Sequence, residues 1–404
     1  MKSTNFFLRA ALAAVFVAAP LAASADAVTD WNMKSADIVI ESKMGTPPAT
    51  RVMAIVQTAA YEAANAVSQR YGAGKFQLEA APGASVDAAI AAAHRATLTK
   101  LMPAQQASID AAYQAALATI ADGTAKASGI AVGEKAAAAV LAARATDGAS
   151  VTETYRPHTT AGVYVPTVVP AVPQWIQRKP WVMSSPSQFR PAPPPALKSE
   201  AWTRDFNEVR LLGGKSSTQR NAEQTEIARF WDFSLPSIYH GVVRSVALAP
   251  GRDATQNARL FAVVAQAMDD ALIAVFDAKY HYNFWRPITA IRNADIDGND
   301  NTEREASWSS FIDTPMHPEY PAGHGILAGA VNGVLQAEIG NGTTPTLTTT
   351  SPTAKGVTRK WNSIEEFSQE VANARVYGGM HYRTSAETGV AMGKKIGALT
   401  AKSF

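Results

Sequence analysis

Residues 51–67 read RVMAIVQTAAYEAANAV, and the spacing of their apolar side chains decides the fold class. These side chains recur three and four positions apart, which places them on one face of an α-helix. They are Val52, Ile55, Val56, Ala59, Ala60 and Ala63. The stretches ASVDAAIAAAHRATLTKLM (84–102) and PAQQASIDAAYQAALATIA (103–121) repeat this alanine-rich pattern, and Pro103 stands where a helix can start. We therefore expect helices over most of residues 36–145.

Helical patterns return in the second half of the chain. They begin near Lys198 and again cover residues 219–233, 255–285, 322–338, 362–376 and 385–400. Strand signals are scarce, and the most β-like stretch is TPTLTTTSPTAK at 344–355. Its prolines and short span predict a loop there. The sequence therefore predicts an all-α protein.

Residues 151–197 separate the two helical regions. Ten of the 23 prolines of the chain lie between residues 155 and 195, and proline fixes φ and lacks a backbone donor. We expect an irregular connection that packs against the body through its aromatic side chains. The predicted organisation is a helical region at 26–150, this connection, and a second helical region at 198–404.

The first 25 residues have the pattern of an export signal. Lys2 and Arg9 precede an apolar stretch, and Ala23-Ser24-Ala25 is a small-residue cleavage site. The alternative is a membrane anchor, but this stretch is too short to span a bilayer. We expect cleavage near Ala25, a periplasmic or secreted protein, and no membrane span in the mature chain.

Composition narrows the function classes. The 404 residues carry a formal charge of +3 and no run of five basic residues, which gives no indication of a nucleic-acid partner. Cysteine is absent, which excludes thiolate nucleophiles and cysteine-based metal sites. No Gly-x-Ser-x-Gly nucleophile elbow and no His-Glu-x-x-His zinc motif is found.

Three segments carry groups that suit a highly charged oxyanion. In AKYHYNFWRPITAIR (278–292), Lys279 and Arg286 are seven positions apart, so a helix would place them within about 20° of one face. Aromatic residues surround both cations, and partial burial of two like charges is costly without an anionic partner. The alternative is a solvated basic face.

In the second segment, PEYPAGHG (318–325), Gly323 and His324 stand at the start of an apolar helical run. Free backbone N–H groups and the helix dipole favour an anion at such a position. His324 could transfer protons there, or could be a satisfied histidine at a helix cap. In the third segment, ARVYGGMHYRTSAETG (374–389), a glycine pair between Arg375 and His381 predicts a turn that can bring both to one side.

The combined pattern is Lys-x6-Arg-Pro, then Pro-Ala-Gly-His, then Arg-x5-His. It resembles the vanadium-dependent haloperoxidase and type 2 phosphatidic acid phosphatase superfamily, and FWRPITAIR and HPEYPAGHG look most like its exported bacterial haloperoxidase-related members. The order of the motifs matches, and the segment PPATRVMAIVQTAAYEAANAV (47–67) also resembles that group. The resemblance implies two units of the four-helix-bundle type.

The resemblance also implies a role for each motif residue. Lys279, Arg286, Arg375 and the backbone N–H of Gly323 would bind the oxygens of vanadate or phosphate. Lys279 would in addition polarise peroxide. His324 would be the general acid–base. His381 would bond to vanadium, or would accept the phosphoryl group in a phosphatase. His240, His281 and His317 are secondary candidates for which we favour packing roles.

Two positions depart from the family pattern. Ala322 replaces the usual serine before the Gly-His pair, which should remove one hydrogen bond to the oxyanion. Ser385 replaces the aspartate that commonly stands four residues after the second histidine and orients its ring, with Glu387 two residues further on. A weaker orienting partner should leave His381 less basic and less firmly held.

Three functions remain open from the sequence. The first is a haloperoxidase that uses vanadate, hydrogen peroxide and a halide. The second is a soluble acid phosphatase of the same superfamily that hydrolyses a phosphomonoester through His381, and the third is an oxyanion-binding scaffold without turnover. The sequence favours the first and does not choose the halide, the organic acceptor or the oligomeric state.

Overall fold

The computed structural model describes residues 26–404, and the predicted export signal lies outside the described residues. Thirteen α-helices and one two-stranded sheet make up the regular structure of this part, so the expected all-α class is confirmed. Within residues 26–404, every helix is too short or too polar to cross a membrane.

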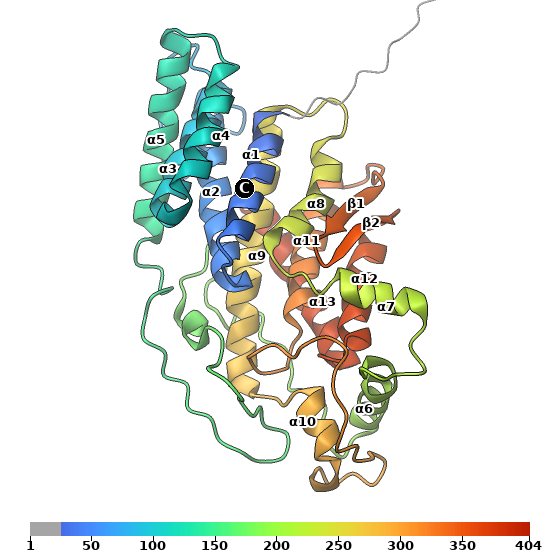
Figure 1. The fold of residues 1–404 in the computed structure, drawn as a ribbon. Helices are drawn as coiled ribbons and strands as arrows, with labels where there is room; N and C mark the ends of the chain where they lie inside the picture. The colour runs from blue at the N-terminus through green and yellow to red at the C-terminus, as the bar shows by residue number, and fades with distance from the viewer. Residues whose placement is uncertain (1–25) are drawn as a thin grey trace, which may run out of the picture.

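Five helices form the N-terminal region, as their alanine-rich periodicity predicts (Figure 1). They are α1 (Ala27–Glu41), α2 (Thr46–Ser68), α3 (Val86–Leu101), α4 (Gln106–Ala118) and α5 (Thr124–Arg144). The six apolar residues used to predict α2 are all buried. Pro103 opens a short 3-10 turn (Pro103–Gln105) directly before α4, because a proline at a first helical position lacks only a donor that would be free anyway.

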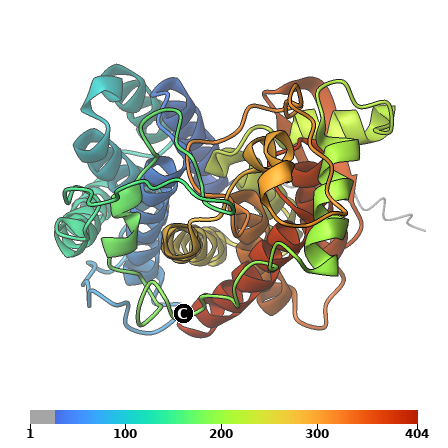
Figure 2. The same cartoon turned by 90° about the horizontal axis from the view of Figure 1, so that it is seen from below.

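Helix α9 (Ala254–Tyr282) runs through the middle of the molecule. Figure 2 shows it nearly end-on, with the N-terminal helices on one side and the C-terminal helices on the other. Its start is fixed by a capping box in which the Asp253 side chain accepts from the backbone of Gln256 and the Gln256 side chain accepts from that of Asp253. Because both sides of α9 are covered, its apolar residues are buried all round the helix.

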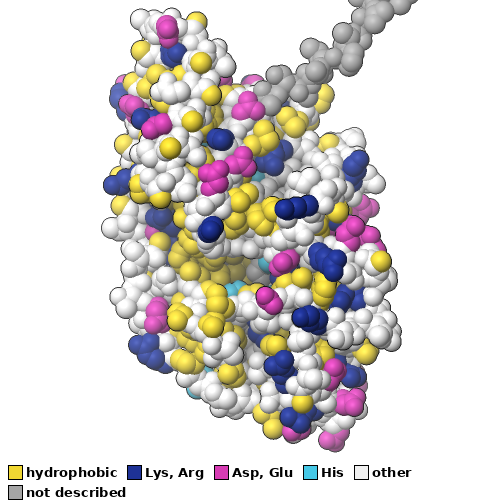
Figure 3. All heavy atoms as spheres, viewed as in Figure 1, with side chains coloured by type: hydrophobic (Ala, Val, Ile, Leu, Met, Phe, Trp, Pro, Cys, Tyr) yellow, Lys and Arg dark blue, Asp and Glu magenta, His cyan; other side chains and the backbone are white. Residues whose placement is uncertain are grey.

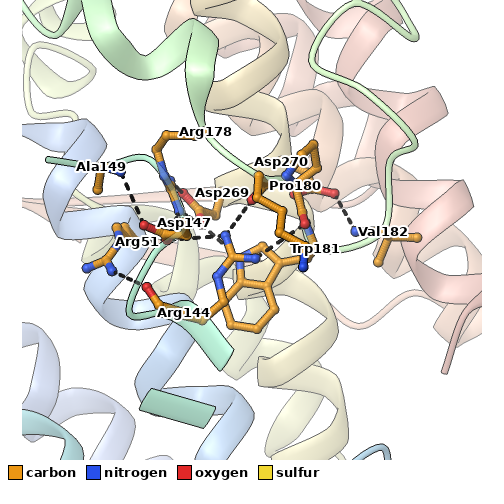
Figure 4. Close-up of polar contacts among 11 residues, drawn as sticks. Arg51, Arg144, Asp147, Ala149, Arg178, Pro180, Trp181, Val182, Asp269 and Asp270 are labelled. Carbon is orange, nitrogen blue, oxygen red and sulfur yellow. Dashed lines mark hydrogen bonds and ion pairs between the residues drawn. The ribbon is translucent and has the colours of Figure 1, made fainter. Parts of the chain in front are cut away.

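The irregular connection is tied to α9 by buried ion pairs and hydrogen bonds (Figure 4). Arg178 donates to Asp269 at 2.6 Å and to Asp147 at 2.7 Å, and all three side chains are buried. Asp270 accepts from the backbone N–H of Trp181 at 2.6 Å and from those of the next two residues. The connection therefore packs against the body, as its aromatic residues predict. Its only regular element is a 3-10 helix (Pro173–Gln177).

The C-terminal region holds the remaining elements. They are α6 (Glu200–Gly213), α7 (Ala222–Phe230), α8 (Pro236–Ala247), α10 (Pro287–Arg292), a 3-10 helix (Ala294–Ile296), α11 (Gly323–Ile339), β1 (Leu347–Ser351), β2 (Ala354–Trp361), α12 (Ile364–Tyr377) and α13 (Arg383–Lys402). Helix α8 is absent from the sequence-based predictions.

The prediction of a loop at residues 344–355 is wrong. Strands β1 and β2 form an antiparallel hairpin in which Leu347 pairs with Trp361 and Ser351 with Ala354. Pro352 does not prevent pairing because it lies in the two-residue turn, outside both strands. The threonines of β1 are β-branched and suit a half-buried strand.

Two glycine rows bring α11 and α13 into close parallel contact. Glycine recurs every four residues on each helix, at 325, 329 and 333 of α11 and at 389, 393 and 397 of α13. A Cβ atom added at any of these six positions would come closer than 3.0 Å to the backbone of the other helix. Because the helices are parallel, their N-terminal ends lie side by side.

Candidate active site

The motif residues come from the ends of five helices that meet in one place. Lys279 lies in the last turn of α9 and Arg286 at the N-cap of α10. His324 is the second residue of α11, Arg375 lies in the last turn of α12, and His381 stands two residues before α13. The turn expected between Arg375 and His381 is present, because Gly379 adopts φ +79°.

The three cations are buried, and the protein gives them mostly neutral partners. The Lys279 Nζ donates to the carbonyl oxygens of Pro318 at 3.0 Å and Glu319 at 2.8 Å. One Nη of Arg375 donates to the carbonyl of Trp231 at 2.7 Å, while its Nε has no partner among the described residues. Burial lowers the pKa of Lys279 far below its usual value and lowers that of Arg375 to about 10. The site therefore holds buried basic groups whose charged forms a bound anion would stabilise.

Arg286 holds the loop around it through four contacts. Its Nε donates to the carbonyl of His317 at 3.0 Å, and its Nη1 donates to that of Met380 at 2.9 Å. The Nη1 also lies 3.2 Å from Nε2 of His381, and Nη2 lies 2.9 Å from Nδ1 of His317. Burial lowers the pKa of Arg286 to about 10, so the guanidinium is charged at neutral pH and can only donate.

The contacts of His381 determine which ring nitrogen carries its proton. Because Arg286 can only donate, Nε2 of His381 must accept and therefore bears a lone pair. The proton is then on Nδ1, which lies 2.8 Å from Oε1 of Glu319. Burial, followed by the charges of Arg286, Lys279 and Arg375, lowers the pKa of His381 far below its usual value. The ring is neutral, and the lone pair of Nε2 faces Arg286.

His324 is also a neutral base in this site. Burial lowers its pKa far below the usual value, followed by the charges of Arg375, Lys279 and Arg286, and a backbone hydrogen bond to Asp232 raises it. The three cations thus act on both histidines, which places the five groups in one electrostatic site. The Nε2 of His324 is buried and has no hydrogen-bonding partner among residues 26–404.

Glu319 is a site residue that the sequence reasoning missed. Its carboxylate is fully buried, and Oε1 accepts from the backbone N–H of Tyr382 at 3.0 Å as well as facing His381. Burial raises the pKa of Glu319 to about 7, while Lys279 and Arg286 lower it. The sequence did contain a signal for this residue. Glu319 is an acidic residue in the PEYPAGHG segment, beside a helix start at which basic residues were expected to lie.

The structure changes the expectation for His381. We predicted a weakly held ring because position 385 lacks a carboxylate, but Glu319 supplies one from a different segment. Ser385 is buried, and its presence lowers the pKa of Glu319, whereas Glu387 is exposed and faces away. Ala322 is fully buried, and its N–H donates to the carbonyl of Ser385 at 3.1 Å.

Of the three secondary histidines, only His317 belongs to the site. Its Nδ1 lies 2.9 Å from Nη2 of Arg286 and 3.1 Å from the carbonyl oxygen of Pro318, and the ring packs edge-on against Phe276. His240 is buried between α1 and α8, where its Nδ1 lies 2.7 Å from Nδ2 of Asn32. His281 is exposed beside Tyr282. A packing role fits the buried His240, whereas His281 lies on the surface and His317 lines the site.

The residues present fit an oxyanion such as vanadate or phosphate. Arg375 and His324 each keep a buried nitrogen that has no partner within residues 26–404, and buried polar atoms are rarely left so. At Gly323, the first residue of α11, a Cβ would meet nothing within 4 Å, so open space adjoins its backbone. A hollow in the middle of the face in Figure 3 is bordered by hydrophobic side chains and shows histidine atoms at its edge.

Comparisons with known proteins agree with the resemblance seen in the sequence. Residues 259–404 match the family described as the VCPO second helical-bundle domain. A vanadium chloroperoxidase from Curvularia inaequalis is 29% identical over 174 residues, which is 35% of this chain and 28% of that protein. The match thus spans less than a third of that relative's length.

Solved structures extend the likeness in fold to almost the whole chain. A bacterial vanadium-dependent iodoperoxidase superposes with a TM-score of 0.79 at 24% identity, covering 94% of this chain and 96% of that one. A bacterial vanadium-dependent chloroperoxidase in its apo form superposes with a TM-score of 0.69 at 19% identity, covering 87% and 92%. These likenesses show the fold of this chain.

Proposed function

We propose that this chain, whose residues 259–404 form a helical-bundle domain of the VCPO type, is a vanadate-dependent haloperoxidase that oxidises a halide with hydrogen peroxide. The observation that supports this most is the set of three buried cations around two neutral histidines, with a single buried carboxylate behind His381. A site with this excess of buried positive charge is stabilised by an anion of high charge.

Lys279, Arg286 and Arg375 would hold the oxygens of vanadate, together with the backbone N–H of Gly323. His381 would be the residue that bonds to it through Nε2, whose lone pair the contact with Arg286 already requires. When bound, vanadate acts as a Lewis acid that activates hydrogen peroxide toward attack by the halide.

His324 would accept and return the proton in this reaction. A hydrogen bond to the backbone of Asp232 engages its ring on one side, and Nε2 is left without a partner. A neutral imidazole in that position can accept a proton from hydrogen peroxide and later return it. Lys279, which is fixed by two carbonyl oxygens, would donate a hydrogen bond to peroxide oxygen.

Two assays on the purified protein test the proposal. Vanadate-dependent, peroxide-dependent halogenation of a dione dye, measured with chloride, bromide and iodide in turn, is the expected activity. Hydrolysis of p-nitrophenyl phosphate that vanadate inhibits would instead favour the phosphatase. Absence of both activities in a protein that binds vanadate would favour a scaffold without turnover.

Two alanine variants assign the activity to the site. His381→Ala should remove halogenation, because it deletes the nitrogen that is proposed to bond to vanadate. His281→Ala is the matched control, since that histidine is exposed and lies outside the site, and it should keep wild-type activity. Wild-type turnover in His381→Ala would contradict the role proposed for this residue.

A further inference from the structure

We propose that Glu319 is the positioning residue that fixes the ring of His381, in place of the acid that the family resemblance leads us to expect at position 385. The carboxylate would thus come from the loop before α11 and not from α13. This inference rests on the proposed oxyanion site, because it concerns how that site presents Nε2 of His381.

The backbone of Glu319 is held at both of its polar groups. Its N–H donates to the carbonyl of Phe284 at 2.8 Å, and its own carbonyl accepts from Lys279 at 2.8 Å. The side chain therefore starts from a fixed point between the end of α9 and the start of α10. A buried carboxylate on a fixed backbone can set the position of whatever it binds.

The Glu319 carboxylate contacts two consecutive residues at the start of α13. Oε1 lies 2.8 Å from Nδ1 of His381 and accepts from the N–H of Tyr382 at 3.0 Å. With Arg286 on Nε2, the ring is held from both nitrogens, and only the form with its proton on Nδ1 satisfies both contacts. Glu319 thus directs the lone pair of Nε2 toward Arg286.

The surroundings of Ser385 explain why that position carries no acid. Ser385 is 1% exposed, its hydroxyl lies in the same buried region as Glu319, and Glu387 is exposed and cannot take part. An aspartate at 385 would add a second carboxylate to a buried space that already holds one. Two carboxylates in such a site cannot both ionise without a large free-energy cost.

This crowding gives a test in which one substitution has opposite effects in two backgrounds. Ser385→Asp in the wild-type protein should weaken orthovanadate binding, because the new acid competes with Glu319. Glu319→Ala alone should weaken binding by about 10–100-fold, the usual effect of removing the partner of a ligating histidine. Adding Ser385→Asp to Glu319→Ala should raise the affinity for orthovanadate at least about tenfold above that of Glu319→Ala alone.

Binding would be measured by calorimetric titration of orthovanadate, and the bound state by vanadium-51 nuclear magnetic resonance. A purely structural role for Glu319 would not reverse the sign of the Ser385→Asp effect. If Glu319→Ala does not fold, the same cycle uses Glu319→Gln, which keeps the shape and removes the charge. Equal effects of Ser385→Asp in both backgrounds, or unchanged affinity on loss of Glu319, would overturn the inference.

The same titration separates the two proposals. Absence of saturable orthovanadate binding by the wild-type protein would contradict the proposed function, and with it the premise of this inference. Wild-type binding that neither Glu319→Ala nor Glu319→Gln alters would contradict the inference alone and leave the proposed function intact.

Discussion

At the scale of single residues, Gly323 is unusual among the glycines of the two parallel helices. A Cβ atom at Gly323 would meet nothing within 4 Å, whereas one at Gly325 would lie 2.7 Å from the carbonyl oxygen of Ala386. The first glycine therefore borders open space beside the proposed oxyanion, and the second permits close helix packing. Their roles differ although they are two positions apart.

Gly323→Ala should fold normally and bind orthovanadate about tenfold or more weakly, because the methyl group enters the space beside a charge-assisted N–H donor. Its free energy of unfolding, measured in urea, should stay the same or rise by up to about 1 kcal/mol, as is usual for alanine in a helix. Gly325→Ala is the matched control and should lower stability. Unchanged vanadate affinity in Gly323→Ala would argue against an anion at this helix start.

The motif residues could be chosen from the sequence because cations beside aromatic residues and a histidine at a helix start are visible in short segments. Glu319 could not be chosen in this way, because its partner His381 is 62 positions away. The proton position on His381 likewise depends on contacts between separate segments. Residue types predict chemistry, but the partner of a buried acid is set by tertiary structure.

At the scale of elements, the glycine rows of α11 and α13 connect packing to the site. The two helices start beside each other, and His324 and His381 lie at those starts. Close backbone contact along the rows therefore fixes the distance between the two histidines. The four-residue glycine spacing was visible in the sequence, but a single helix does not show which partner its glycine face will meet.

Gly393→Ala should push α11 and α13 apart, because the added Cβ would lie closer than 3.0 Å to backbone atoms of residues 326 and 330. Overpacking of this kind typically lowers the free energy of unfolding by about 1–3 kcal/mol. Gly45→Ala is the control, since its Cβ would meet nothing within 4 Å. Urea unfolding of both variants is the measurement, and equal stability would contradict the close packing.

The buried ion pairs in Figure 4 give a second prediction for an element, the connection between the helical regions. Arg178→Met should lower the free energy of unfolding by roughly 3–5 kcal/mol, because it leaves Asp269 buried without its cation. Arg190→Met should lower it by only about 0–1 kcal/mol, because its pair with Asp277 is partly exposed. If urea unfolding shows a similarly small loss of unfolding free energy for both variants, the buried ion pair between Arg178 and Asp269 does not hold the connection against α9 as proposed.

The hairpin and α8 show where element prediction fails. Proline within 344–355 argued for a loop, but the chain places Pro352 in the turn, where it breaks no ladder hydrogen bond. Helix α8 has 12 residues and begins with a proline at its first position. It packs between α1 and β1, and such tertiary packing, from which most helical stability comes, is not visible in local periodicity.

At the scale of the whole molecule, α9 joins the two helical regions into one body. Apolar periodicity predicted that this segment is a helix, but it could not show that helices would cover it on both sides. The N-terminal region contributes buried titratable groups of its own. His94 is fully buried, stacks on Trp31 and leaves Nε2 without a partner among the described residues.

His94 should make the protein lose stability in mild acid. Burial lowers its pKa from 6.5 to about 4, so its full contribution is present above pH 6.5 and is lost as pH falls toward about 4. By the usual conversion of pKa shift to free energy, the loss should be about 3 kcal/mol. His94→Phe keeps an aromatic ring and should reduce the dependence of unfolding free energy on pH between these values; the part that remains comes from the other buried histidines, whose pKa burial also lowers.

Trp31→Phe is the control for that experiment, since it alters the same stacked pair without removing a titrating group. It should lower stability by a similar amount at each pH and leave the pH dependence as in the wild type. A slope in His94→Phe equal to the wild-type slope would show that this histidine is not the acid-sensitive group.

The central claim is that Lys279, Arg286, Arg375, His324 and His381 form one oxyanion site. Calorimetric titration of orthovanadate into the purified chain, repeated with phosphate as competitor, tests it most directly. One saturable site per chain is expected; phosphate should compete for it, His381→Ala should lose it and His281→Ala should keep it. Absence of binding, or binding that His381→Ala leaves unchanged, would contradict it.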